Sequence, residues 1–157
     1  LLLSLANHGF ERIFVVNGHG GNIATAKAAF AQTYATINSL KLPVSSRFRC
    51  KLSNWFMADS VFREARKLYG NKEGQHATPS EIAVTLFLEP NLLQKQRPLP
   101  EPAPVGPIHG PLDFRIRYPD GRMGSDPYLA NSEDGENLLK KAASDLTNEI
   151  KDFLQEP

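Results

Sequence analysis

Two histidines lie in sequence contexts that could support hydrolytic chemistry. His19 occupies the glycine-rich sequence NGHGGN at residues 17–22, and His76 precedes Glu81 in the sequence HATPSE. Imidazole and carboxylate groups together suit zinc or another divalent metal, and a metal-bound water with a nearby base is a recurrent hydrolytic arrangement. An imidazole that is not held by metal could instead carry a proton to a leaving amine. We therefore treat the two loops as candidate halves of one site.

The glycines beside the first histidine favour a ligand site. Gly18, Gly20 and Gly21 remove side-chain bulk after the apolar run at residues 13–16, so the chain can turn sharply and a metal or substrate can approach closely. We expect the backbone of these glycines and of Asn22 to line the substrate pocket. Two alternatives stay open: a plain turn, and a cradle that offers helix N-terminal amides to a phosphate. The glycine spacing does not fit the dinucleotide fingerprint, and no Gly-Lys-Ser/Thr follows.

Glu81 has a structural explanation beside the functional one. Thr78-x-x-Glu81 fits a capping box with Pro79 at the first helical position, which accounts for the carboxylate without any metal. His76 has no comparable structural reason to be there. The local sequence therefore leaves the role of Glu81 open and favours a functional role for His76.

Composition excludes several classes of function. The 157 residues are 41% hydrophobic and 22% charged with a net charge of +1, which indicates one globular domain and gives no electrostatic case for nucleic acid. No apolar run approaches the roughly 20 residues that span a membrane. The single cysteine, Cys50, excludes an internal disulfide and fits a reducing compartment, so we expect a cytoplasmic protein.

Periodicity in the first half predicts the elements that position the first histidine. We expect a buried strand at residues 12–16, a helix at 23–39 and a second strand in the alternating run at 44–50. Strand, helix and strand in this order imply a right-handed crossover and a parallel pair. Cys50 falls on the apolar face of the second strand, with Val44 and Phe48, and is expected to be a buried structural thiol.

The second half predicts mainly helices. One helix begins at Asp59 or Ser60 and ends at residues 68–70, a second covers 78–89, and a long amphipathic helix begins at Ser132. Recurrent prolines make residues 98–111 an extended arm on the surface or at a subunit contact. Alternating apolar residues at 114–118 before Asp120-Gly121 predict a short strand and a hairpin.

Three segments together resemble the creatininase (creatinine amidohydrolase) family. They are residues 9–22, which contain NGHGGN; residues 76–81; and residues 118–127, followed by Gly135-Glu136, which are similar to the closing segment of that family. The first motif is fairly specific to the family. The other two are weak indicators alone and become strong indicators when all three occur in this order. The resemblance covers nearly the whole chain.

The resemblance implies an α/β fold with a mostly parallel sheet flanked by helices in three layers (α/β/α). Residues 1–157 would form one domain that is incomplete at its N-terminus. It also implies one or two divalent metals (Zn, Mn or Fe), hydrolysis of an amide C–N bond in a small molecule, and a homo-oligomer. By position, His19 would be a metal ligand, His76 a proton carrier near the substrate, and Glu81 an acidic ligand or the support of one.

Two departures from the family pattern limit what the resemblance implies. Creatininase itself has a metal-binding glutamate two residues after the motif histidine, where this chain has Gly21. The family's upstream Glu-x-His-Gly segment and bridging aspartate have no counterpart here, and the apolar residues 1–6 read as the end of a helix. We therefore expect a C-terminal portion of a longer protein. The family name does not identify the substrate, which we expect to be a small amide such as a cyclic amide or a formamide.

Two other functions remain as alternatives. A non-catalytic binding or assembly protein could retain the fold and use an incomplete metal shell for structure or ligand capture. A phosphate or nucleotide binder would instead use the glycine turn at residues 17–22 and would hold an anion rather than a metal.

Overall fold

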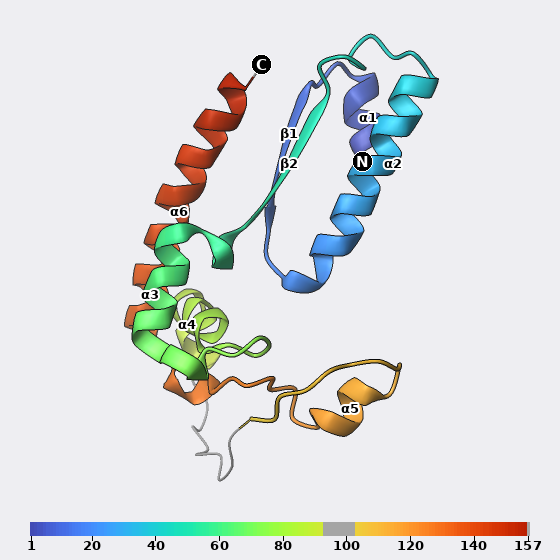
Figure 1. Cartoon of the computed structure of the whole chain (residues 1–157). Coiled ribbons are helices and arrows are strands. Elements are labelled where there is room, and N and C mark those ends of the chain that lie inside the picture. Colours follow the sequence, from blue (N-terminus) through green and yellow to red (C-terminus); the bar gives the residue numbers. More distant parts are fainter. Residues whose placement is uncertain (93–102, 157) are drawn as a thin grey trace. The chain divides into compact units, whose positions relative to one another are not determined.

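The computed structural model describes residues 1–92 and 103–156 and contains two compact units (Figure 1). Unit 1 comprises Leu1–Ala58 together with the residues from Ser144 onward, and unit 2 comprises Asp59–Ala143. The long helix α6, Ser132–Gln155, contributes residues to both units.

Unit 1 is built around a parallel pair of strands. Its elements are α1 (Leu2–Asn7), β1 (Arg12–Asn17), α2 (Ile23–Ser39) and β2 (Arg49–Asn54). Arg12 lies opposite Arg49 and Asn17 opposite Asn54, so both strands end at the same edge. This confirms the position of the predicted first strand, the helix at 23–39 and the parallel pairing, and it places the two carboxyl ends beside each other. Residues 12–15 are half-buried and Val16 is exposed, so the predicted burial of this strand is wrong.

Helices cover both faces of this pair. On one face Ile13 and Cys50 pack against a buried cluster from α1, α2 and the following turn: Ala6, Ile37, Val44 and Phe48. On the other face the ring of Phe14 lies 5.8 Å from the ring of Phe153 in α6. The α/β fold class is thereby confirmed. Cys50 is half-buried in this packing, and its burial raises the pKa of the thiol.

The predicted strand at residues 44–50 is wrong in its bounds. Residues 43–47 form a turn, in which the amides of Arg47 and Phe48 both donate to the carbonyl of Val44, at 2.9 and 2.8 Å. Val44 and Phe48 are both buried. Residues four apart share a face in a helical turn as well as in a strand, so the alternation did not distinguish the two. The strand begins only at Arg49.

Unit 2 consists mainly of helices. They are α3 (Asp59–Tyr69), α4 (Pro79–Leu88), α5 (Asp113–Arg117) and the first part of α6. The two predicted helices at 59–70 and 78–89 and the long C-terminal helix are confirmed. A Cβ at Gly135 of α6 would fall 3.0 Å from Phe87 and closer still to the carbonyl of Ala83, so glycine allows α4 and α6 to touch along their backbones.

The predicted strand at 114–118 is a helix instead. The carboxylate of Asp113 accepts the amides of His109 and Gly110 and fixes the start of α5, and the amide of Tyr118 donates to Phe114 at 2.8 Å. The four-residue spacing again suits both structures. The Asp120-Gly121 turn exists, with Gly121 at φ +83°, but it follows a helix and makes no hairpin.

The predicted arm at 98–111 lies partly outside the described residues. Its described part, residues 103–111, forms neither helix nor strand. None of the helices in the described ranges is both long and apolar enough to cross a membrane.

Candidate functional site

Asn17 holds the turn around His19 together. It is the last residue of β1 and only 4% exposed. Its side-chain amide donates to the carbonyl of His19 at 2.8 Å and to the side chain of Asn54 at 2.7 Å. Its side-chain oxygen accepts the amide of His19 at 3.3 Å and the side chain of Asn22 at 3.2 Å. One buried side chain therefore ties both ends of the turn to the adjacent strand.

His19 lies exposed beyond the carboxyl end of β1. Its backbone is extended, and its ring Nδ1 accepts the amide of Gly21 at 3.0 Å, which caps the short turn Gly20–Asn22 before α2. In this bond the lone pair of Nδ1 faces the Gly21 amide. A cation that takes the Nδ1 lone pair must displace the Gly21 amide.

The glycines of this turn differ in what surrounds them. A Cβ at Gly21 would lie 3.0 Å from Nδ1 of His19, so glycine permits the cap, whereas a Cβ at Gly18 would meet no atom within 4 Å. The carbonyl of Gly18 accepts the indole N–H of Trp55 at 3.3 Å. Asn54, the last residue of β2, and Trp55, which follows it, were not predicted. They join the turn because adjacent parallel strands end at one edge.

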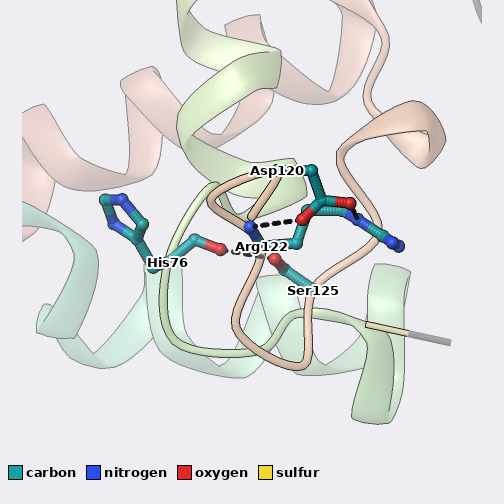
Figure 2. Close-up of polar contacts among 4 residues, drawn as sticks. All are labelled: His76, Asp120, Arg122 and Ser125. Atoms are coloured by element: carbon teal, nitrogen blue, oxygen red, sulfur yellow. Dashed lines mark hydrogen bonds and ion pairs between the residues drawn. The ribbon is translucent and has the colours of Figure 1, made fainter. Parts of the chain in front are cut away.

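The loop around His76 is held by residues 118–127, which we call the closing segment. Both lie in unit 2. The amide of Met123 donates to the carbonyl of His76 at 3.3 Å, and the amide of Gln75 donates to the carbonyl of Met123 at 2.8 Å. The hydroxyl of Ser125 also donates to the His76 carbonyl, and the imidazole points away from the Asp120–Arg122 pair (Figure 2). Two of the motifs that resemble the family are therefore in direct contact.

The backbone on both sides of His76 is unusual. Gly74 has φ +67°, and a Cβ there would lie 2.5 Å from the carbonyl oxygen of Met123 and closer to the amide of Ser125. Ala77, directly after the histidine, has φ +52° although it is not glycine. Left-handed backbone at a non-glycine residue is strained by about 1 kcal/mol or more and occurs often at functional sites. The surrounding contacts must hold this conformation in place.

The closing segment is itself fixed by an ion pair. The amide of Arg122 donates to Oδ1 of Asp120 at 3.1 Å, and its Nε donates to Oδ2 at 2.8 Å. Arg122 is 8% exposed. These hydrogen bonds hold the pKa of Asp120 below its ordinary value, so the carboxylate stays charged and the turn at residues 120–122 stays closed.

Glu81 forms the predicted capping box. The hydroxyl oxygen of Thr78 accepts the amide of Glu81 at 3.2 Å, and the amide of Thr78 donates to Oε2 of Glu81 at 3.3 Å. A carboxylate has about four lone-pair sites, so this role leaves Glu81 able to accept a further contact. The structural explanation is confirmed, and it does not exclude ligation.

Glu73 is a residue that sequence reasoning missed. Its Oε1 accepts the hydroxyl of Ser80, and within the described ranges its buried Oε2 has no hydrogen-bond partner. Burial raises its pKa above the ordinary value of 4.5. Its contact joins the start of the His76 loop to the first turn of α4. No sequence pattern marks it, because the contact depends on how the loop folds back.

The predicted site residues fall into two groups. His19, Gly18, Gly20, Gly21 and Asn22 belong to unit 1, whereas His76 and Glu81 belong to unit 2. Within the part of the chain that the structure describes, no three His, Cys, Asp or Glu side chains come together as a metal-binding group. The convergence of the two groups on one metal therefore stays a prediction.

Comparison with solved structures finds the same fold in several creatininases. A creatinine amidohydrolase (creatininase) aligns with a TM-score of 0.78 and 20% identity over 99% of this chain and 61% of that chain. A manganese creatininase aligns at 0.76 and 19%, and a mutant creatininase described as Zn-Zn type aligns at 0.75 and 20%, with the same two coverages. The chain thus spans 61% of the length of these proteins.

Comparison with families completes the assignment. A search of curated proteins finds no significant match. The family model described as creatinine amidohydrolase matches residues 1–150, which include all three motifs. The end of α6 lies beyond the matched residues. This chain therefore belongs to the creatininase family.

Proposed function

We propose that this chain is the C-terminal part of a divalent-metal-dependent amidohydrolase that cleaves the C–N bond of a small amide, such as a cyclic amide or a formamide. The observation that carries the proposal is His76, which follows the close approach of Gly74 to the backbone of Met123 and precedes the strained residue Ala77, and which the closing segment fixes in place. Family membership supports the reaction class. We further propose a cytoplasmic homo-oligomer without nucleic-acid or membrane partners.

The residues of this chain would divide the work between the two loops. His19 would offer one imidazole to zinc, manganese or iron, and Glu81 would add or support an acidic ligand through the lone pairs that its cap leaves. His76 would carry a proton to the leaving nitrogen. When bound, the metal supplies Lewis acidity and lowers the pKa of a bound water. The backbone of Gly18, Gly20, Gly21 and Asn22 would line the pocket.

The described side chains alone do not complete a metal shell, since no group of three ligand-type residues occurs among them. We propose that the missing ligands lie in a segment upstream of these residues, where the family carries Glu-x-His-Gly and an aspartate. The proposal is therefore tested on the full-length protein.

The first experiment measures metal content and hydrolysis together. We expect elemental analysis of full-length protein to find a divalent metal, and a panel of formamides and cyclic amides to yield at least one substrate. His76→Gln should keep the metal and lower kcat at least about 100-fold. His19→Ala should lower the metal content. His8→Ala, whose ring forms a hydrogen bond with the carbonyl of Ser4, is the matched control and should change neither quantity.

The outcomes separate the proposal from its rivals. Metal without turnover on any substrate would favour a non-catalytic binding protein. Phosphate bound in place of metal would favour an anion cradle at residues 17–22. Either result overturns the enzymatic proposal.

A second experiment separates the two roles of Glu81. Glutamine can replace glutamate in a capping box, so Glu81→Gln should keep the stability of α4 while losing the charge that a ligand needs. We expect reduced metal affinity in this variant with little change in unfolding temperature. Unchanged metal affinity would restrict Glu81 to capping.

A further inference from the structure

The imidazole of His76 packs against an aromatic ring that the sequence did not connect with it. The ring centroids of His76 and Phe114 lie 5.6 Å apart, with the planes at 71°, which is a T-shaped pair. Aromatic rings prefer this edge-to-face geometry, so the contact favours one orientation of each ring over others. Both side chains are half-buried. The contact is therefore specific in direction, unlike general apolar packing.

Phe114 is itself held rigidly. Its ring lies 5.6 Å from the ring of Tyr118, which is 2% exposed and whose hydroxyl donates to the carbonyl of Gly106. The start of α5 is fixed by the carboxylate of Asp113, which accepts two backbone amides. Because Phe114 is held in place by these contacts, its ring can restrict the orientation of the His76 ring.

The two supports of His76 are also tied to each other. The amide of Gly124, in the closing segment, donates at 3.0 Å to the carbonyl of Pro104, which precedes α5. The closing segment holds the His76 carbonyl through Ser125, and the segment with α5 holds its ring. The main chain and the side chain of one histidine are thus fixed by connected pieces of unit 2.

We propose that Phe114 is a positioning residue that fixes the imidazole of His76 in the orientation needed for proton transfer. The proposal rests on the proposed function for its kinetic consequence, but the orientation of the ring can be measured without any reaction. Phe114 would touch no reacting atom and would act through the histidine.

The matched control lies on the same helix. Ile116 is 75% exposed and two residues from Phe114, so Ile116→Ala changes the apolar content of α5 without removing a buried ring. Phe114→Leu keeps an apolar side chain and removes the aromatic ring, and Phe114→Tyr keeps the ring. Comparing these three variants and Phe114→Ala separates loss of α5 from loss of the ring contact.

The kinetic test uses the full-length enzyme. We expect Phe114→Ala and Phe114→Leu to lower kcat about 3- to 10-fold, as expected for one lost aromatic pair, and to change KM less than about twofold. Phe114→Tyr should restore kcat to within about twofold of the wild type, and Ile116→Ala should match the wild type. A uniform fall in all four variants would indicate a structural role and overturn the proposal.

The second readout is the NMR spectrum of the histidine ring protons. The chain has four histidines, so His76→Gln assigns the signals of His76 directly. We expect Phe114→Leu to move these signals by removing the ring current, and Ile116→Ala to leave them in place. Unmoved signals would overturn the proposal. Moved signals in a protein without hydrolytic activity would uphold it and count against the proposed function instead.

Discussion

The turn around His19 and the loop around His76 hold their histidines by different means. The first is bonded mostly within itself, through hydrogen bonds between residues two to five positions apart, and Asn54 of β2 and Trp55 directly after it add two more. The second depends on residues 49 positions later, where Ser125 holds the His76 carbonyl. A turn held by local hydrogen bonds can be recognised from its sequence motif. A loop that is held by residues far along the chain cannot be recognised in this way, apart from its histidine.

Their glycines serve different purposes for the same reason. A Cβ at Gly18 would meet no atom within 4 Å, so the exposed turn has open space beside this glycine. Gly74 has backbone atoms on the side where a Cβ would stand and a positive φ, so in the packed loop glycine leaves room for the protein itself. Alanine at Gly74 should therefore reduce the stability of the protein, whereas alanine at Gly18 should leave it nearly unchanged.

The largest predicted effect is that of Gly74→Ala. The added methyl group would collide with the backbone of Met123 and Ser125, which cannot move aside, and alanine would be strained at φ +67°. We expect the free energy of unfolding to fall by about 3 kcal/mol or more. Chemical denaturation followed by fluorescence of Trp55 measures this change.

Gly18→Ala is the matched substitution in the other loop. Its Cβ meets nothing within 4 Å, so the free energy of unfolding should change by less than about 0.5 kcal/mol. Equal losses in the two variants would contradict the contrast between an open and a packed loop.

The next effect concerns Asn17, the centre of the local turn. Asn17→Ala removes hydrogen bonds to three residues from a buried position and takes the Asn17 donor away from Oδ1 of Asn54. We expect a loss of about 2 kcal/mol in the free energy of unfolding and a 10- to 100-fold loss in metal affinity. Thermal unfolding and calorimetric titration with zinc or manganese measure the two quantities.

Asn22→Ala tests whether the effect belongs to the buried centre. Asn22 is exposed and makes one bond to Asn17, so its loss should reduce stability by only about 0.5 kcal/mol. If Asn22→Ala were the more damaging of the two, Asn17 would not be the residue that organises the turn.

The same contrast explains how much could be predicted. The position of the first strand, the helix at 23–39, the capping box at Thr78 and the long C-terminal helix depend on patterns within a few residues, and all were read correctly from the sequence. His19 and His76 were recognised as candidates by their neighbours. The sequence could not show that the closing segment packs on His76, because that contact joins residues far apart in the chain.

The wrong bounds of the second strand and the wrong strand at 114–118 have one physical cause. Val44 with Phe48, and Phe114 with Tyr118, are apolar residues four positions apart, and this spacing places them on one face of a helical turn as well as of a strand. The hydrogen bonds that decide between the two, such as Phe48 to Val44 and Tyr118 to Phe114, leave no mark on the pattern. Glu73 was missed for the related reason that its partner, Ser80, lies across a loop.

A smaller effect is expected from the two caps. Thr78 caps α4, a helix of 10 residues, so Thr78→Ala should lower the free energy of unfolding by about 1 kcal/mol and Thr78→Ser by little. His19 caps a three-residue turn from an exposed position, and His19→Ala should lower it by about 0.5 kcal/mol or less. Denaturant midpoints of the metal-free protein measure both. A larger loss of unfolding free energy in His19→Ala than in Thr78→Ala would show that the His19 turn supports structure beyond its own residues.

The smallest effect is a pH dependence that belongs to the packed loop. Burial raises the pKa of Glu73 above 4.5, with the charge of Glu81 adding to the shift and the hydrogen bond from Ser80 opposing it. A raised pKa in the folded state stabilises the protein fully below pH 4.5, where glutamate is protonated in both states. As the pH rises through the raised pKa, the unfolded chain releases its proton first and this contribution is lost.

Glutamine has the shape of protonated glutamate and does not titrate, so Glu73→Gln should avoid that loss. We expect the variant and the wild type to be closest in stability at pH 4, and the variant to become relatively more stable toward pH 7. Denaturation midpoints across this range measure the difference. A difference that stayed constant would mean that Glu73 is as well solvated as the residues of the His19 turn, and the contrast between an open and a packed loop would lose its electrostatic part.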